Sequence, residues 1–147
     1  MFTTHSKELA HIKSVCEWST HRFGGKIVLF GSSAGAPFAG SVVDDLPSIV
    51  GLVVVGYTFG WLASIIFSGH FKHVTRSTKP KCFIMGTSDE FTTVSQLQRA
   101  VKKCHGDVND VILYDGVGHF ELESDAYDED IVAKVLAWIL KYDLGAE

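Results

Sequence analysis

The sequence predicts an α/β fold, in which a mostly parallel sheet of about four strands lies between helices in three α/β/α layers. Two observations support this class. Short apolar runs of strand length alternate with amphipathic segments, and the first run, Ile27–Phe30, is wholly apolar, as a strand covered on both faces is. Strands that alternate with helices form a parallel sheet through right-handed crossovers. With 147 residues, 46% of them hydrophobic, residues 1–147 are expected to form a single domain.

The first part of the chain is expected to hold a helix, then a strand and a helix joined by a sharp turn. Ser6 is a suitable cap for the first helix, whose apolar residues recur at helical spacing, and Gly24 with Gly25 ends it. The strand Ile27–Phe30 follows. Pro37 then falls in the first turn of the next helix, where its missing N–H costs little.

The rest of the chain continues the alternation. Further strands are predicted at Ile49–Tyr57, Lys81–Met85 and Val111–Tyr114. A helix capped by Thr92 or Thr93 is expected to run to Gly106. The last helix begins at Ser124 or Asp125, and its acidic first turn suits the positive end of the helix dipole.

One segment, Leu46–Phe71, has no formally charged residue and is long enough to cross a membrane. Its proline and glycines argue against a span, and a buried strand accounts for its first half. The second half, Thr58–Phe71, is interpreted as an apolar helical excursion over the carboxyl ends of the strands, where open α/β sheets bind ligands. As part of a partial lid over Thr58–Arg76, Phe59 and Trp61 are candidate substrate-binding residues, although such aromatic residues more often belong to a core.

Composition excludes some classes of partner. The formal net charge is −4 and there is no basic patch, so no nucleic acid partner is expected. The cysteines Cys16, Cys82 and Cys104 are odd in number and widely spaced, which favours reduced thiols over a disulfide framework. The polar start of the chain is unlike a signal peptide. These features together predict a cytoplasmic protein.

Residues 31–35, Gly-Ser-Ser-Ala-Gly, match the motif GxSxG, with Ser33 as its central serine. A serine at a sharp strand-to-helix turn has a strained backbone, and side chains at Gly31 and Gly35 would collide with it. The alternative is an ordinary glycine-rich turn whose N–H groups bind a phosphate or nothing. Neither the dinucleotide motif nor the phosphate-loop motif fits these residues.

A serine nucleophile needs a base and an acid, which in this kind of fold follow it in the order Ser, Asp or Glu, His. Asp89 follows the third predicted strand, in GTSDEF, and His119 follows the fourth, in GVGHF. Because parallel strands end at one edge of a sheet, both side chains are expected beside Ser33. The alternatives are that His119 is a loop histidine bonded to backbone, that Asp89 only forms a turn, and that Glu90 or Asp115 is the acid.

His70 and His73 are three residues apart, a spacing at which two histidines could in principle bind a metal. No third ligand accompanies them, so a solvated helix face is the favoured interpretation, and neither a metal nor an organic cofactor is predicted.

The three segments GSSAG, GTSDEF and GVGHF together resemble the α/β-hydrolase superfamily, particularly its small dienelactone-hydrolase-like and serine-esterase-like members, which include plant proteins with a similar GSSAGAP run. The resemblance extends from about Ser6 to the end of the last helix. It implies that Ser33 is the nucleophile, Asp89 the orienting acid and His119 the base, and that the backbone N–H of Ala34 donates to the oxyanion. The implied substrate is a small-molecule ester or thioester.

The resemblance covers only the carboxyl-terminal half of that fold, so the expected fold is a truncated α/β-hydrolase. Family members place four more strands, and a loop with a second oxyanion donor, before the helix that here begins at Ser6. An open edge on the strand Ile27–Phe30, and self-association through it, are therefore expected. Since loss of one oxyanion donor costs about 100- to 1000-fold in turnover, the alternative function is a catalytically impaired binding module.

Overall fold

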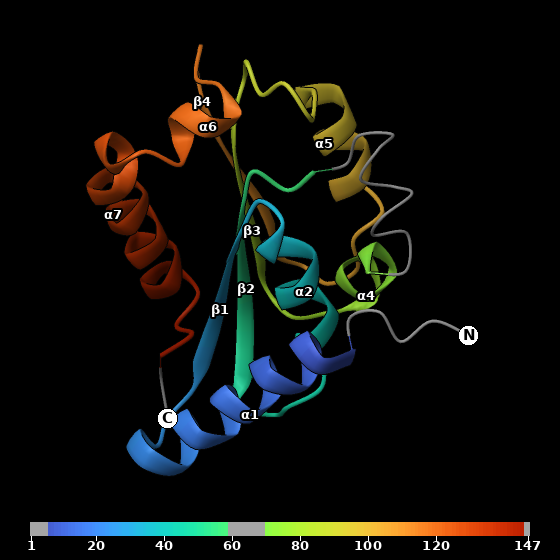
Figure 1. Cartoon of the computed structure of the whole chain (residues 1–147), viewed down its shortest axis with the longest axis vertical. Coiled ribbons are helices and arrows are strands. Elements are labelled where there is room, and N and C mark those ends of the chain that lie inside the picture. Colours follow the sequence, from blue (N-terminus) through green and yellow to red (C-terminus); the bar gives the residue numbers. More distant parts are fainter. Residues whose placement is uncertain (1–5, 59–69, 146–147) are drawn as a thin grey trace.

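The computed structural model describes residues 6–58 and 70–145 (Figure 1). Its strands are β1 (Ile27–Ser32), β2 (Ile49–Val55), β3 (Lys81–Gly86) and β4 (Asn109–Tyr114). Its helices are α1 (Ser6–Phe23), α2 (Gly35–Val42), α4 (Phe71–Arg76), α5 (Val94–Val101), α6 (His119–Leu122) and α7 (Asp125–Lys141). Phe59 and Trp61, the predicted substrate-binding residues, lie outside the described residues, as does most of the predicted lid.

The four strands form one sheet in the order β1-β2-β3-β4, and every neighbouring pair is parallel. The predicted fold class is therefore confirmed. The central strands β2 and β3 are buried almost throughout, which explains why their sequences are apolar without alternation. β2 ends at Val55, two residues before the predicted end, because Gly56 turns the chain out of the strand with φ +59°.

Helices cover both faces of the sheet (Figure 1). One face packs against α1, α2, α4 and α5, and the other against α6 and α7. Cys16 of α1, Ala36 and Ala39 of α2, Val74 of α4 and Leu97 of α5 join the first core cluster. Leu122, Ile131 and Trp138 join the second. Within the described parts of the chain, none of the helices is long and apolar enough to cross a lipid bilayer.

Helix α5 begins as predicted and ends early. Its cap, Thr93, forms a capping box with Gln96, which satisfies two N–H groups at the start of the helix. The predicted end at Gly106 is wrong, because regular helix stops at Val101. The chain then turns so that Gly106 approaches the segment after α4, where a Cβ on Gly106 would lie 2.4 Å from the carbonyl oxygen of Thr78. Glycine is needed for this approach, which a longer helix would prevent.

Lys81, the first residue of β3, is completely buried. Its ammonium Nζ donates to the carbonyl oxygens of Ser77 at 2.7 Å, Lys79 at 2.8 Å and His105 at 2.9 Å. Burial lowers the pKa of this amine. The side chain therefore joins the start of β3 to the segment that follows α4 and to the one that precedes β4.

At the edge of the sheet, β1 pairs only with β2 among the described strands. Phe30 on β1 remains 53% exposed, and helix α7 exposes a stripe of apolar side chains nearby. The stripe consists of Val132, Leu136 and Leu140. Helix α1 packs against α2 and does not pair with the strand. The predicted open edge of the strand at Ile27–Phe30 is thus present in the described structure.

Candidate active site

Ser33 lies in the two-residue turn between β1 and α2 and has a positive φ of +47°. A residue with a side chain rarely adopts this left-handed backbone, so the turn stores strain. Two backbone hydrogen bonds hold it: the N–H of Ser33 donates to Val55 at 2.9 Å, and the N–H of Ala36 donates to Ser33 at 3.1 Å. The serine is therefore fixed at the carboxyl end of β1, beside the end of β2.

The two glycines of GxSxG have different roles. A Cβ on Gly31 would lie 2.8 Å from the Cα of Ala36, so only glycine allows α2 to pack closely against the end of β1. For Gly35 the predicted steric reason is wrong. A Cβ there would meet nothing within 4 Å, and its backbone is not left-handed.

His119 follows β4, at the opposite end of the strand order from β1, yet its side chain lies beside Ser33. Its Nε2 lies 2.8 Å from the Oγ of Ser33, and its Nδ1 lies 2.7 Å from Oδ2 of Asp89. The imidazole and the carboxylate are each 1% exposed. His119 begins the short helix α6 instead of lying in a loop. The three predicted side chains thus form one hydrogen-bonded chain, named here the Ser33–His119–Asp89 chain.

The direction of these bonds follows from the donors available. An ionised Asp89 can only accept, so Nδ1 of His119 carries the proton that it donates to Oδ2. Nε2 then has a free lone pair and accepts the hydroxyl proton of Ser33. This is the tautomer in which the imidazole can remove a proton from the serine.

Asp89 is held by its other oxygen. Oδ1 accepts the backbone N–H groups of Phe91 and Thr92, both at 2.8 Å. The hydroxyl of Thr92 in turn donates to the carbonyl oxygen of Tyr57, just beyond β2, at 3.0 Å. The carboxylate therefore does form a turn, as the alternative interpretation held, and the same turn aims its second oxygen at His119.

The rival acids lie elsewhere. Asp115 is exposed, and its Oδ1 accepts the hydroxyl of Thr87 at 3.2 Å. Glu90 Oε2 accepts the backbone N–H of His119 at 2.8 Å, and this bond is the main cause of the lowered pKa of Glu90. Glu90 thus caps the start of α6. It directly follows Asp89, the acid that binds the imidazole.

Two glycines that sequence reasoning missed shape the pocket around the imidazole. A Cβ on Gly56, which follows β2, would lie 2.8 Å from Cε1 of His119. A Cβ on Gly118 would lie 2.8 Å from Oε1 of Glu90. The only signal in the sequence is that Gly56 lies near the end of the predicted strand Ile49–Tyr57 and that Gly118 follows the predicted strand Val111–Tyr114.

Ala34 is exposed and directly precedes α2. N–H groups at the start of a helix have no acceptor within that helix, and the partial positive charge there favours an anion. The predicted oxyanion donor therefore lies at a suitable end of a helix, next to Ser33.

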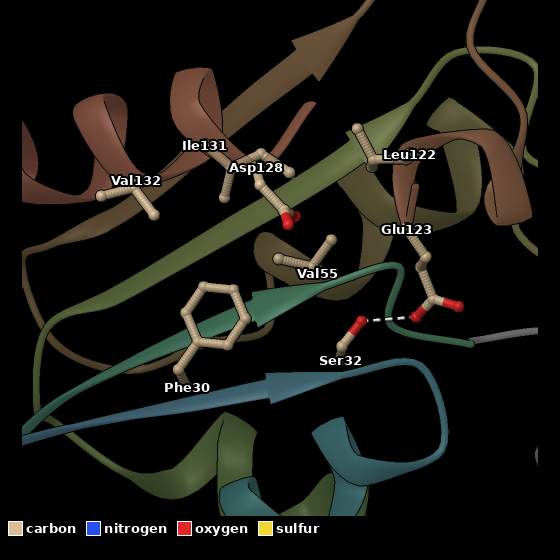
Figure 2. Close-up of a pocket in the computed structure, with 8 residues that line it drawn as sticks. All are labelled: Phe30, Ser32, Val55, Leu122, Glu123, Asp128, Ile131 and Val132. Atoms are coloured by element: carbon tan, nitrogen blue, oxygen red, sulfur yellow. Dashed lines mark hydrogen bonds between the residues drawn. The ribbon is translucent and has the colours of Figure 1, made fainter. Parts of the chain in front are cut away.

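A groove of about 600 Å³ runs beside the site, between the ends of β1 and β2 and the helices α6 and α7 (Figure 2). It is lined by Phe30, Ser32, Val55, Leu122, Glu123, Asp128, Ile131 and Val132. The hydroxyl of Ser32 donates to Oε1 of Glu123 at 2.5 Å across the groove. None of Ser33, His119 and Asp89 lines it, so the groove is next to the hydrogen-bonded chain and is separate from it.

Of the two histidines that are three residues apart, only one has the exposure that was predicted. His73 is exposed on α4, but His70 is only partly exposed, and its Nδ1 lies 2.5 Å from the hydroxyl of the buried Ser41. The solvated-face interpretation is therefore wrong for His70, because α4 packs against α2 there. Across residues 6–58 and 70–145, no three His, Cys, Asp or Glu side chains are grouped as metal ligands.

The comparisons with known proteins concern the fold. No family model and no curated protein matches the sequence. Among solved structures, the chain resembles an esterase domain from Rhodothermus marinus, with a TM-score of 0.73 and 14% identity over 89% of this chain and 67% of that one. It also resembles a monoacylglycerol lipase from Paleococcus ferrophilus, with a TM-score of 0.73 and 15% identity over 95% of this chain and 76% of that one.

A third similar structure is an α/β serine hydrolase homologue from Coxiella burnetii, with a TM-score of 0.73 and 21% identity over 92% of this chain. The chain spans 62% of the length of that protein. The parallel sheet with helices on both faces is thus a fold that this chain shares with these three structures. At these identities the likeness establishes the fold.

Proposed function

We propose that this protein is a serine hydrolase that cleaves an ester or thioester of a small molecule through an acyl-enzyme on Ser33. The observation that carries the proposal is the Ser33–His119–Asp89 chain, with bonds of 2.8 and 2.7 Å at a strained strand-to-helix turn. The esterase domain and the lipase that share the fold support the same class of reaction.

Each group has a defined role in the proposed reaction. Nε2 of His119 takes the hydroxyl proton while Oγ of Ser33 attacks the carbonyl carbon, and Asp89 stabilises the imidazolium that forms. The N–H of Ala34 donates to the oxyanion. The imidazolium then protonates the leaving alcohol or thiol. In the second half, His119 removes a proton from water, the hydroxide attacks the acyl carbon, and the acid leaves as Ser33 regains its proton.

The finer assignments belong to the same proposal. Within the α/β-hydrolase superfamily, the proposed relatives are the dienelactone-hydrolase-like and serine-esterase-like members. The segments GSSAG, GTSDEF and GVGHF support this assignment. A cytoplasmic location is proposed because Cys16, Cys82 and Cys104 are all free thiols.

The first prediction is that a fluorophosphonate labels the folded protein at Ser33. His119→Ala is expected to reduce the labelling rate more than Asp89→Asn, because the base acts on the serine proton directly and the acid acts through the base. The rate of labelling is measured by intact-mass spectrometry, and the labelled residue is found by peptide mapping.

Ser32→Ala is the matched control, since Ser32 is the neighbouring serine and bonds to Glu123 instead of His119. It is expected to leave labelling intact, whereas Ser33→Ala removes it. Folded protein that takes up no label would contradict the hydrolase proposal and favour a binding module built on the same fold.

A further inference from the structure

Two phenylalanine rings enclose the imidazole of His119. The centroid of the Phe91 ring lies 4.8 Å from that of the imidazole, at an interplanar angle of 77°. The Phe120 ring lies 5.3 Å away at 84°, and the two phenyl rings lie 5.7 Å apart at 86°. These are edge-to-face contacts of the kind that aromatic rings prefer. They help to keep His119 only 1% exposed.

The same two rings also face solvent. Phe91 is 45% exposed and Phe120 is 69% exposed. A single exposed apolar residue needs no explanation, but two that touch each other and the buried histidine form a continuous apolar surface. We name this surface the Phe91–Phe120 platform.

The chemistry of the proposed reaction determines which part of a substrate lies near His119. Nε2 must donate a proton to the leaving oxygen, so that oxygen has to come within hydrogen-bond distance of Nε2. The acyl group stays on Ser33, and the substituent of the leaving oxygen extends from the imidazole. The rings that pack on the imidazole are therefore neighbours of the alcohol part of the ester.

We propose that the Phe91–Phe120 platform binds the alcohol part of the substrate, and that it selects esters whose alcohol carries an aromatic ring. This inference rests on the proposed function. An aromatic alcohol can extend the edge-to-face contacts that the two phenyl rings already make with each other.

The charges around the platform disfavour an anionic alcohol. Glu90 caps the backbone N–H of His119, and Oε2 of Glu121 accepts the N–H of Gly118 at 3.4 Å. Both carboxylates are exposed, Glu90 on the loop that carries Phe91 and Glu121 on helix α6, which carries Phe120. An alcohol that bears a phosphate or carboxylate would be repelled by them. The inferred substrate class is therefore an ester of an aryl or arylalkyl alcohol without a negative charge.

The second prediction uses two isomeric esters, benzyl acetate and methyl phenylacetate, with methyl acetate as the reference. They carry the same ring on the alcohol side and on the acyl side respectively. Benzyl acetate is expected to have a kcat/KM about ten times that of methyl acetate, a typical gain from one apolar contact surface. Phe91→Ala together with Phe120→Ala is expected to remove this preference, because it lowers kcat/KM about ten times more for benzyl acetate than for methyl acetate and methyl phenylacetate.

Phe23→Ala, which changes an equally exposed ring on α1, is the control and is expected to keep the preference. Because Phe91 also packs on His119, Phe91→Leu is measured as a smaller change that retains an apolar side chain. An equal loss with all three esters in every platform variant, or an unchanged preference, would overturn the inference.

A second measurement separates the platform from the proposed function. Benzyl alcohol is titrated into the Ser33→Ala protein, and the amide resonances of Phe91 and Phe120 are followed by NMR. If these amides shift in Ser33→Ala but the wild-type protein hydrolyses none of the esters, the hydrolase proposal is refuted and the platform is supported as a binding surface for the aromatic alcohol. Hydrolysis without such shifts, and with no effect of the two substitutions, would refute the platform alone.

Discussion

At the scale of single residues, the candidate site depends on the carboxylates of two consecutive residues, Asp89 and Glu90. Asp89 bonds to the imidazole of His119, and Glu90 bonds to its backbone N–H. Both groups lie on the loop after β3, so this loop fixes the orientation of the ring and the start of the helix that carries it. We therefore expect Glu90 to be a positioning residue, because it acts through His119.

The third prediction tests this role of Glu90. Glu90→Gln retains an oxygen that can accept the N–H of His119, whereas Glu90→Ala leaves that N–H without its partner. Labelling of Ser33 is expected to be near normal in the first variant and about ten times slower in the second. The downfield NMR signal of the imidazole N–H that donates to Asp89 is expected to broaden in the alanine variant only.

Asp115→Ala is the control for this prediction, since Asp115 bonds to Thr87 on the same edge without touching the histidine. Equal labelling of both Glu90 variants would show that the cap has no part in positioning the base.

At the scale of elements, the sequence predicted every strand and the longer helices, because each has its own apolar pattern. It also placed Ser33, Asp89 and His119 together, because parallel strands end at the same edge of a sheet. It could not place the contacts of Gly56 and Glu90 with His119, since these depend on how loops from different strands cross. The buried state of Lys81 was missed for the same reason, as its three acceptors come from separate segments.

The fourth prediction concerns that lysine. Lys81→Met is expected to lower the free energy of unfolding by about 3 kcal/mol or more, because three carbonyl oxygens lose a charged donor inside the protein. Chemical denaturation followed by circular dichroism measures the change. Lys102→Met, at an exposed site after α5, is expected to change stability by less than about 0.5 kcal/mol. If the two variants were equally stable, the three bonds would contribute nothing net.

At the scale of the whole molecule, the side of β1 that pairs with no other described strand is the most consequential surface. It combines backbone donors and acceptors that face no described strand with the exposed ring of Phe30 and with the apolar stripe on α7. Val132 of that stripe and Phe30 line the same groove (Figure 2). Strand edges of this kind pair readily with other chains unless a charge or a proline interrupts them.

The fifth prediction is that the 147-residue chain self-associates through this edge. Light scattering after size-exclusion chromatography is expected to show a mass that grows with protein concentration. Phe30→Lys is expected to shift the protein to monomer, because a charge on an edge strand opposes pairing. Val15→Lys, at an exposed apolar site on α1, is expected to leave the association unchanged. A stable wild-type monomer would rule out the edge as an association surface.

The position of Ser33 directly after this strand links assembly to reactivity. Within the described residues β1 has one neighbouring strand, β2, and the N–H of Ser33 donates to Val55 at the end of that strand. A strand added along the open side would contribute its own free energy of binding to the alignment of the serine with His119. By thermodynamic linkage the effect is mutual, so the modification of Ser33 and the occupancy of the edge bias each other's equilibrium.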